Sequence, residues 1–67
     1  MSKTLAALKD SVASIGPKTT CDQAPAGVKP SCDACLLEVT QQQKIDCVAK
    51  IVYCHLNPND ETTCSSN

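Results

Sequence analysis

Apolar residues recur with the period of an α-helix near the start of the chain. Four of them fall on one face of a helical projection, and we call them the N-terminal stripe: Leu5, Leu8, Val12 and Ile15. Their spacing predicts an amphipathic helix over about residues 3–15. Gly16 and Pro17 should end this helix, because glycine suits the residue after a helix and proline cannot continue one.

The middle of the chain is rich in residues that interrupt regular structure. Three prolines and both glycines fall within residues 16–30, which predicts a loop with turns that contains Cys21. Residues 31–57 have neither glycine nor proline, but their apolar positions change phase near Thr40. Thr40 and Gln43 also have the spacing of a capping box, in which each side chain bonds to the other residue's backbone N–H. A new helix should therefore begin directly after Thr40.

These signals predict an all-α fold of three helices. A short helix over 32–39, capped by Ser31, and a longer helix over 41–56, ended by Asn57-Pro58, should form a helical hairpin. The helix over 3–15 should pack across that hairpin. Residues 59–67 are polar and should form an extended tail, held at one point by Cys64. We expect residues 1–67 to be a single domain.

The cysteine content changes how so small a fold should be stabilised. The chain has 67 residues, six cysteines and one aromatic residue, Tyr53, so an apolar core alone has little volume to bury. Three structural disulfides, at about 2–4 kcal/mol each, would supply the stability that so small a core lacks. The cysteines expected to form them are Cys21, Cys32, Cys35, Cys47, Cys54 and Cys64.

The same cysteine content bears on where the protein acts. An even number of cysteines in a short chain is typical of secreted proteins. The first residues lack the long apolar run of a signal peptide, so we expect a mature secreted chain to which Met1 was added for expression. A cytosolic protein that starts at Met1 is the alternative. We expect no insertion into a membrane, since no apolar run in the sequence is long enough.

Helix geometry favours one pairing among the cysteines. With a turn between the two predicted helices of the hairpin, Cys35 and Cys47 lie about 8 Å and about 11 Å from that turn, so that they can meet across the hairpin. Cys54 lies further along and would reach Cys21 or Cys64. We therefore prefer a bridge between Cys35 and Cys47, while the other pairings stay open.

Three other kinds of cysteine chemistry are weaker alternatives. Cys32 and Cys35 could bind zinc together with Cys47, Cys54 or His55, but their spacings are not those of a common zinc module. A redox motif at 32–35 would lack the usual strand–helix surroundings. A nucleophile–base pair of Cys54 and His55 is disfavoured, since neighbours on a helix point about 100° apart. We expect no catalytic residue, no metal and no cofactor.

Charge and exposed features indicate the kind of partner. The net charge is −1 and arginine is absent, which argues against binding nucleic acids and against a membrane-lytic peptide. We expect a protein partner to bind the N-terminal stripe, because no cysteine fastens residues 1–20, and self-association through the same helix is a further expectation. The alternative is that the stripe packs internally. Other candidate contacts are the loop 22–31, Tyr53 and an acidic face that carries Glu38 and Asp46.

Two short segments resemble known secreted families. Cys-Asp-Ala-Cys-Leu-Leu-Glu-Val at 32–39 resembles the opening of a saposin-type helix. Lys-Ile-Val at 50–52, Leu-Asn-Pro at 56–58 and the later Cys64 are similar to a segment of elicitins, the sterol-carrying secreted proteins of oomycetes. The elicitin resemblance implies an alternative function as a small-lipid or sterol carrier.

The sequence as a whole favours a binding protein over an enzyme. A rigid, cross-linked scaffold suits preorganised binding, and no acid–base or nucleophilic group of residues is visible. We therefore expect a secreted, non-enzymatic ligand, such as an effector, signal or toxin-like protein, that acts on a protein receptor. Carriage of a small lipid or sterol is one alternative. Inhibition of a secreted enzyme through the loop 22–31 is another.

Overall fold

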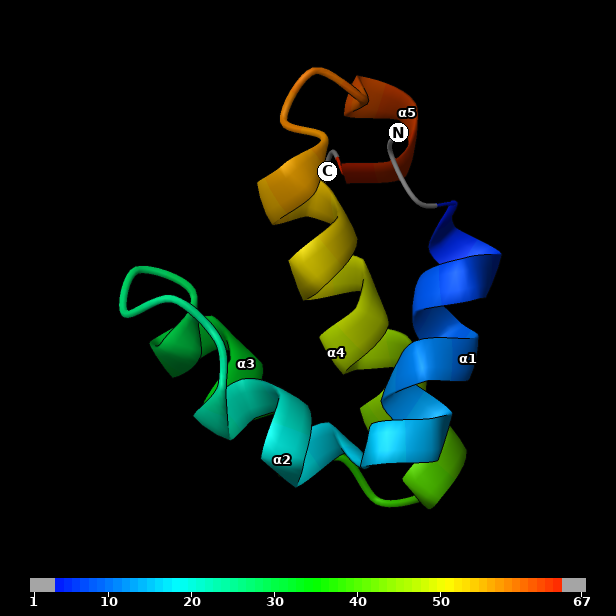
Figure 1. Ribbon diagram of the computed structural model, residues 1–67, viewed down its shortest axis with the longest axis vertical. Helices are drawn as coiled ribbons and strands as arrows, with labels where there is room; N and C mark the ends of the chain where they lie inside the picture. The colour runs from blue at the N-terminus through cyan, green and yellow to red at the C-terminus, as the bar shows by residue number, and fades with distance from the viewer. Residues whose placement is uncertain (1–3, 65–67) are drawn as a thin grey trace.

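The computed structural model describes residues 4–64 of the chain, and these residues are arranged as helices without strands. The helices within them are α1 (Leu5–Ile15), α2 (Pro17–Asp22), α3 (Lys29–Cys35), α4 (Gln41–Leu56) and α5 (Glu61–Cys64). α1 and α4 lie side by side and run in opposite directions, and α2 and α3 lead away from the end where α1 finishes (Figure 1). The predicted class, a small disulfide-rich all-α fold, is confirmed.

The first helix begins and ends close to the predicted positions. The Thr4 hydroxyl accepts a hydrogen bond of 3.1 Å from the Ala7 N–H, which satisfies one of the N–H groups that have no partner within the helix. α1 therefore starts at Leu5, while Lys3, in the predicted range, lies outside the described residues. At the other end Gly16 has a φ of 105°, a conformation that favours glycine, and its N–H donates to the Val12 carbonyl at 2.7 Å.

The predicted loop over 16–30 is wrong for most of its length. Pro17 occupies the first position of α2, where its missing N–H costs nothing because the first N–H groups of a helix have no intrahelical acceptor. The Thr20 hydroxyl donates to the Gly16 carbonyl at 2.8 Å within the same helix. Pro30 lies in the first turn of α3 in the same way. These prolines start helices, and Cys21 lies in a helix, so that residues 23–28 alone connect α2 to α3.

The short helix predicted over 32–39 begins and ends too late. α3 spans Lys29–Cys35, and Val28, not Ser31, occupies its N-cap position. The next three N–H groups, from Leu36 to Glu38, bond to carbonyls three residues back, and such tight turns end the helix. Residues 36–40 then connect α3 to α4 as turns and bends.

The helix over 41–56 is confirmed at both ends. The Thr40 hydroxyl accepts from the Gln43 N–H and the Gln43 side chain accepts from the Thr40 N–H, each at 3.1 Å, which completes the predicted capping box. The extended tail predicted after it is wrong for residues 61–64, which form α5. The Asp60 carboxylate accepts from the Thr63 N–H at 3.2 Å and so begins this short helix. Residues 65–67 of that predicted tail lie outside the described residues.

The core lies where α1 and the pair α2–α3 meet α4. Its buried residues come from the four longer helices and the α2–α3 connection: Leu8, Val12, Cys21, Val28, Cys32, Cys35, Ile45, Val48 and Ala49. Among the described residues no polar or charged side chain is buried. Three of the nine residues in this core are disulfide cysteines, so sulfur occupies volume that aromatic rings fill in larger domains.

Candidate binding surfaces

The disulfides join each helix from α2 onward to the next one along the chain. Cys21 bonds to Cys32, and Cys35 bonds to Cys47 as the helix geometry predicted. The third bridge joins Cys54 to Cys64, one of its two expected partners.

Because all six sulfurs are bonded in this way, the zinc and redox alternatives lack the thiolates that they require. Nor do any three His, Cys, Asp or Glu residues between positions 4 and 64 come together as a group that could hold a metal ion. Cys54 is not available to His55 as a nucleophile, because its sulfur belongs to the third bridge. The cysteines are therefore structural in this fold.

The N-terminal stripe is divided between the interior and the surface. Leu8 and Val12 are buried, and Leu5 packs against the edge of the core. Ile15, in contrast, is 52% exposed at the end of α1. A partner could contact the middle of the stripe only if α1 left α4, so the apolar surface that is accessible here is at Ile15.

Exposed apolar residues gather at the end of the molecule where α1 finishes and α4 begins. Figure 1 shows the α1–α2 junction and the connection 36–40 together at this end, which is at the bottom of the view. Leu37 and Val39 lie in that connection and are 86% and 89% exposed. We call Ile15, Leu37 and Val39 the apolar rim. Isolated exposed apolar residues are ordinary, but a group of them at one end of a small domain marks a candidate interaction site.

A cleft of about 350 Å³ lies beside the apolar rim, and we call it the basal cleft. One wall comes from the α1–α2 junction and the first turn of α2, and the other from Leu36 and the start of α4. The residues that line it are Gly16, Pro17, Lys18, Thr19, Leu36, Gln41 and Lys44. Its two charged residues, Lys18 and Lys44, are both cationic and come from opposite walls.

Sequence analysis did not single out either of these lysines. The available signal was indirect: Lys18 follows the predicted end of one helix and Lys44 follows the predicted start of an antiparallel one, so the two belong at the same end of the fold.

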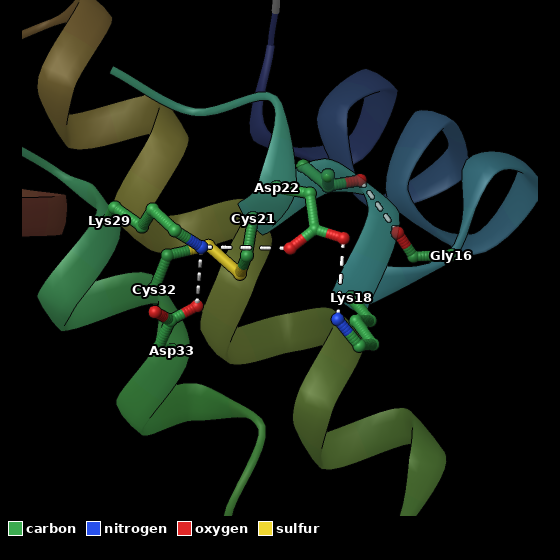
Figure 2. A network of polar contacts seen from close by, with 8 residues as sticks. Gly16, Lys18, Cys21, Asp22, Lys29, Cys32 and Asp33 are labelled. Carbon is green, nitrogen blue, oxygen red and sulfur yellow. Dashed lines mark hydrogen bonds and ion pairs between the residues drawn. A yellow bond between two sulfur atoms is a disulfide. The ribbon is translucent and has the colours of Figure 1, made fainter. Parts of the chain in front are cut away.

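The connection 23–28 is a second candidate site, because its two ends are held together. The Cys21–Cys32 bridge closes its base, and Lys29 places its ammonium 3.6 Å from Asp22 and 3.4 Å from Asp33. Figure 2 shows these charges beside the disulfide, together with Lys18, which lies 3.3 Å from Asp22. The charged side chains are about half exposed or more, so each pair adds at most about 1 kcal/mol. The covalent bridge is the stronger constraint on this connection.

A smaller pocket of about 210 Å³ lies between the connection 23–28 and α4. It is lined mainly by apolar groups, with His55 and Gln23 among its polar residues: Thr20, Gln23, Ala24, Pro25, Val28, Val52 and His55. Pockets for drug-sized ligands have volumes of about 300–1,000 Å³. This pocket is below that range, and a molecule as large as a sterol would not be enclosed by it.

The predicted partner contact Tyr53 is a half-buried residue with a structural hydrogen bond. Its hydroxyl donates to the Asp60 carboxylate, which ties the start of α5 to α4. This hydrogen bond, with smaller effects of burial and of the Asp60 charge, raises the pKa of Tyr53. The same bond, with the Thr63 N–H, lowers the pKa of Asp60. The other predicted polar contact, the acidic face of Glu38 and Asp46, is partly neutralised, because Asp46 pairs with Lys9 at 3.6 Å.

None of the helices within residues 4–64 has the length and apolar character needed to cross a membrane. The short likenesses of 32–39 to saposins and of 50–58 to elicitins find no support over a longer stretch of chain. Comparison with protein-family models, with curated protein sequences and with solved structures finds no significant match to this chain.

Proposed function

We propose that this chain is a secreted, non-enzymatic ligand that binds a protein partner at its basal cleft and apolar rim. The observation that carries this proposal is the apolar rim itself. Within residues 4–64, four large aliphatic side chains are more than half exposed. Three of them form the apolar rim beside the cleft, and the fourth, Leu56, lies at the opposite end of α4. The three disulfides support secretion, since such bonds persist in oxidising compartments.

The energetics of burial favour a protein contact at this end. Covering a Leu, Ile or Val side chain yields about 1.5–3 kcal/mol, so the apolar rim can contribute a large part of a micromolar affinity. The connection 36–40 also begins directly after Cys35, whose bridge to Cys47 fastens that end of the connection to α4. A surface that is rigid before binding loses less conformational entropy when a partner docks on it.

The chemistry of the described residues fits a binding role. Among them Tyr53 and Asp60, whose pKa values are shifted in opposite directions, are hydrogen-bonded to each other, and that bond ties the start of α5 to α4. The cysteines are bonded in pairs, which leaves no sulfur nucleophile.

The proposal can be tested with a phage-displayed library of random peptides selected against the folded protein. We expect peptides whose binding is saturable by calorimetry and at least tenfold weaker for the double variant Leu37→Ser/Val39→Ser. The control is Leu56→Ser, because Leu56 is 56% exposed at the opposite end of α4. Failure to select any peptide, or equal binding by the double variant, would overturn the proposal. Circular dichroism would verify that each variant keeps its helices.

Inhibition of a secreted enzyme is a second candidate function, and the bridged connection 23–28 favours it. Pro25, Ala26 and Gly27 are exposed, while Cys21–Cys32 fixes the base of the connection. Inhibitory loops are held rigid in this manner so that little entropy is lost on binding. A panel of secreted proteases would test this candidate: we expect saturable inhibition that is lost when the peptide bond after Ala26 is cut and is unaffected by Leu37→Ser/Val39→Ser. Absence of inhibition across the panel would refute the inhibitor function.

A further inference from the structure

The basal cleft is positively charged in a molecule whose net charge is −1. Lys18 and Lys44 line it from opposite walls, and no Asp or Glu belongs to its lining. The charges of the chain are therefore unevenly distributed, and the cleft beside the apolar rim has an excess of positive charge.

One of the two lysines, Lys44, has no carboxylate partner among the described residues, and the other shares its partner with a third lysine. Lys44 is half-buried, yet none of the carboxylates within the described part of the chain lies within 4.0 Å of its ammonium. Lys18 does pair with Asp22, but that carboxylate is shared with Lys29, which is 3.6 Å away. An anion that entered the cleft would meet Lys44 without having to displace an existing ion pair.

Apolar surface adjoins these charges on both sides. Leu36 lies in the lining of the cleft, and two residues of the apolar rim, Ile15 and Leu37, directly adjoin the lining residues Gly16 and Leu36 in the chain. A small free anion would leave this apolar surface exposed to water, and a purely apolar ligand would leave the two ammonium groups without a counter-charge. A ligand that is complementary to the cleft therefore carries both an anionic group and apolar groups.

We infer that the basal cleft takes an acidic, amphipathic segment of a protein partner, with an Asp or Glu carboxylate between Lys18 and Lys44 and apolar side chains on Leu36 and the apolar rim. This inference rests on the proposed function and adds the chemistry of the partner. Each charge contact contributes about 0.2–1 kcal/mol, so a partner with this carboxylate should bind about tenfold more tightly than one without it.

An anionic lipid surface is the competing occupant, and the structure favours it less. A lysine near such a surface contributes about 1 kcal/mol, so two lysines provide a weak attraction. Aromatic side chains anchor proteins at bilayer interfaces, but Tyr53, the single aromatic residue, is bonded to Asp60 near the far end of α4. The cleft is also concave, which suits a polypeptide segment better than a flat bilayer.

The test uses three synthetic peptides with one apolar pattern and with Glu, Gln or Lys at their polar positions. Binding is followed by calorimetry and by amide chemical shifts of the full chain. We expect the Glu peptide to bind about tenfold more tightly than the Gln peptide at low salt, with shifts centred on residues 15–19 and 36–44. High salt should remove this advantage, since exposed charges are screened.

Variants of the chain identify the side chains that contact the charged group of the peptide. Lys18→Glu/Lys44→Glu should reverse the preference in favour of the Lys peptide, and Lys44→Gln should reduce the advantage of the Glu peptide about threefold. Lys50→Glu is the matched control, because Lys50 is exposed on α4 outside the cleft, and it should leave the preference for the Glu peptide in place.

Three results would overturn the inference. Equal binding of the Glu and Gln peptides would show that apolar contacts alone act here; the inference would fail while the proposed function stood. Binding of none of the three peptides would also refute it, and the library selection would then decide the proposed function separately. Binding to vesicles of phosphatidylserine and phosphatidylcholine, without a preference for the Glu peptide, would assign the cleft to a membrane surface instead.

Discussion

Removing the Cys35–Cys47 bridge should destabilise the fold far more than removing the Cys54–Cys64 bridge. The perturbation is a pair of double variants, Cys35→Ala/Cys47→Ala and Cys54→Ala/Cys64→Ala. The two bridges close loops of similar length, with sequence separations of 12 and 10. In the unfolded chain each bridge therefore removes about the same entropy, worth about 3 kcal/mol. Any difference between the two variants arises in the folded state.

We expect the folded state to keep its shape when the first bridge is removed. Cys35 is buried in the core, where α3 and α4 pack against each other. Replacing its sulfur leaves a small cavity that costs about 1 kcal/mol, in addition to the unfolded-state effect. The expected loss is about 4 kcal/mol. Since a domain of this size has a free energy of unfolding of about 3–10 kcal/mol, this variant should be marginally stable.

The folded state responds differently when the second bridge is removed. Within residues 4–64, α5 contacts α4 alone, and Cys54 and Cys64 are both partly exposed. Without the bridge α5 can leave α4 while the core stays packed. The folded state then gains conformational entropy as the unfolded state does, and this gain offsets part of the loss of stability. The expected loss is about 1–2 kcal/mol.

Guanidinium chloride unfolding, followed by far-ultraviolet circular dichroism, measures both losses. With a slope of about 2 kcal/mol per molar, the unfolding midpoint should fall by about 2 M for Cys35→Ala/Cys47→Ala and by less than about 1 M for Cys54→Ala/Cys64→Ala. Hydrogen exchange should show that α5 amides lose protection in the second variant while α4 keeps its own. Equal midpoint shifts in the two variants would refute the reasoning, because α5 would then be part of the cooperative core.

Three further perturbations test the core, a helix cap and a hydrogen bond. Val48→Ala should lower the free energy of unfolding by about 2–3 kcal/mol, since Val48 is fully buried, whereas Val39→Ala should change it by less than about 0.5 kcal/mol in the same guanidinium chloride titration. Thr40→Ala removes the capping box of α4 and should cost about 1 kcal/mol, and an unchanged midpoint would contradict the assigned cap. The Tyr53–Asp60 hydrogen bond lowers the pKa of the carboxyl and raises the pKa of the phenol, so its stabilisation should be complete between their ordinary pKa values of 3.8 and 10.0. It should be lost as pH falls through the lowered pKa of Asp60 and again as pH rises through the raised pKa of Tyr53. In α5 amide exchange Tyr53→Phe should remove the alkaline dependence and weaken the acidic one, part of which remains because Thr63 also lowers the pKa of Asp60.

The parts of the fold that sequence reasoning predicted well depend on local signals. Thr40 and Gln43 define the start of α4 through bonds between residues three apart, and Asn57-Pro58 lies at its end. Gly16 ends α1 for a reason that belongs to that residue alone, its tolerance of a φ of 105°. The Cys35–Cys47 bridge was predicted correctly from helix rise, although α3 ends at Cys35 and residues 36–40 are turns and bends instead of the last turn of a helix.

The errors arose where one residue type has two local meanings. Pro17 and Pro30 were interpreted as loop residues, but proline is as well suited to the first turn of a helix as to a turn. The later start predicted for α3 follows from the same error, because the helix was placed after Pro30 instead of around it. In α5, Asp60 has the spacing of an N-cap toward Thr63, yet four residues are too few for a periodic apolar pattern.

The sequence alone determined that this chain is helical, where its longest helix lies and that disulfides supplement a small core. Tertiary structure decided which surfaces remain for a partner. The packing of α1 along α4 buries Leu8 and Val12 and leaves Ile15 exposed, and it brings Lys18 to the same cleft as Lys44. Helix periodicity and caps are interactions between residues a few positions apart, which a sequence pattern displays directly. A cleft between residues 16–19 and 36–44 depends on how distant segments pack, and no local pattern encodes that distance.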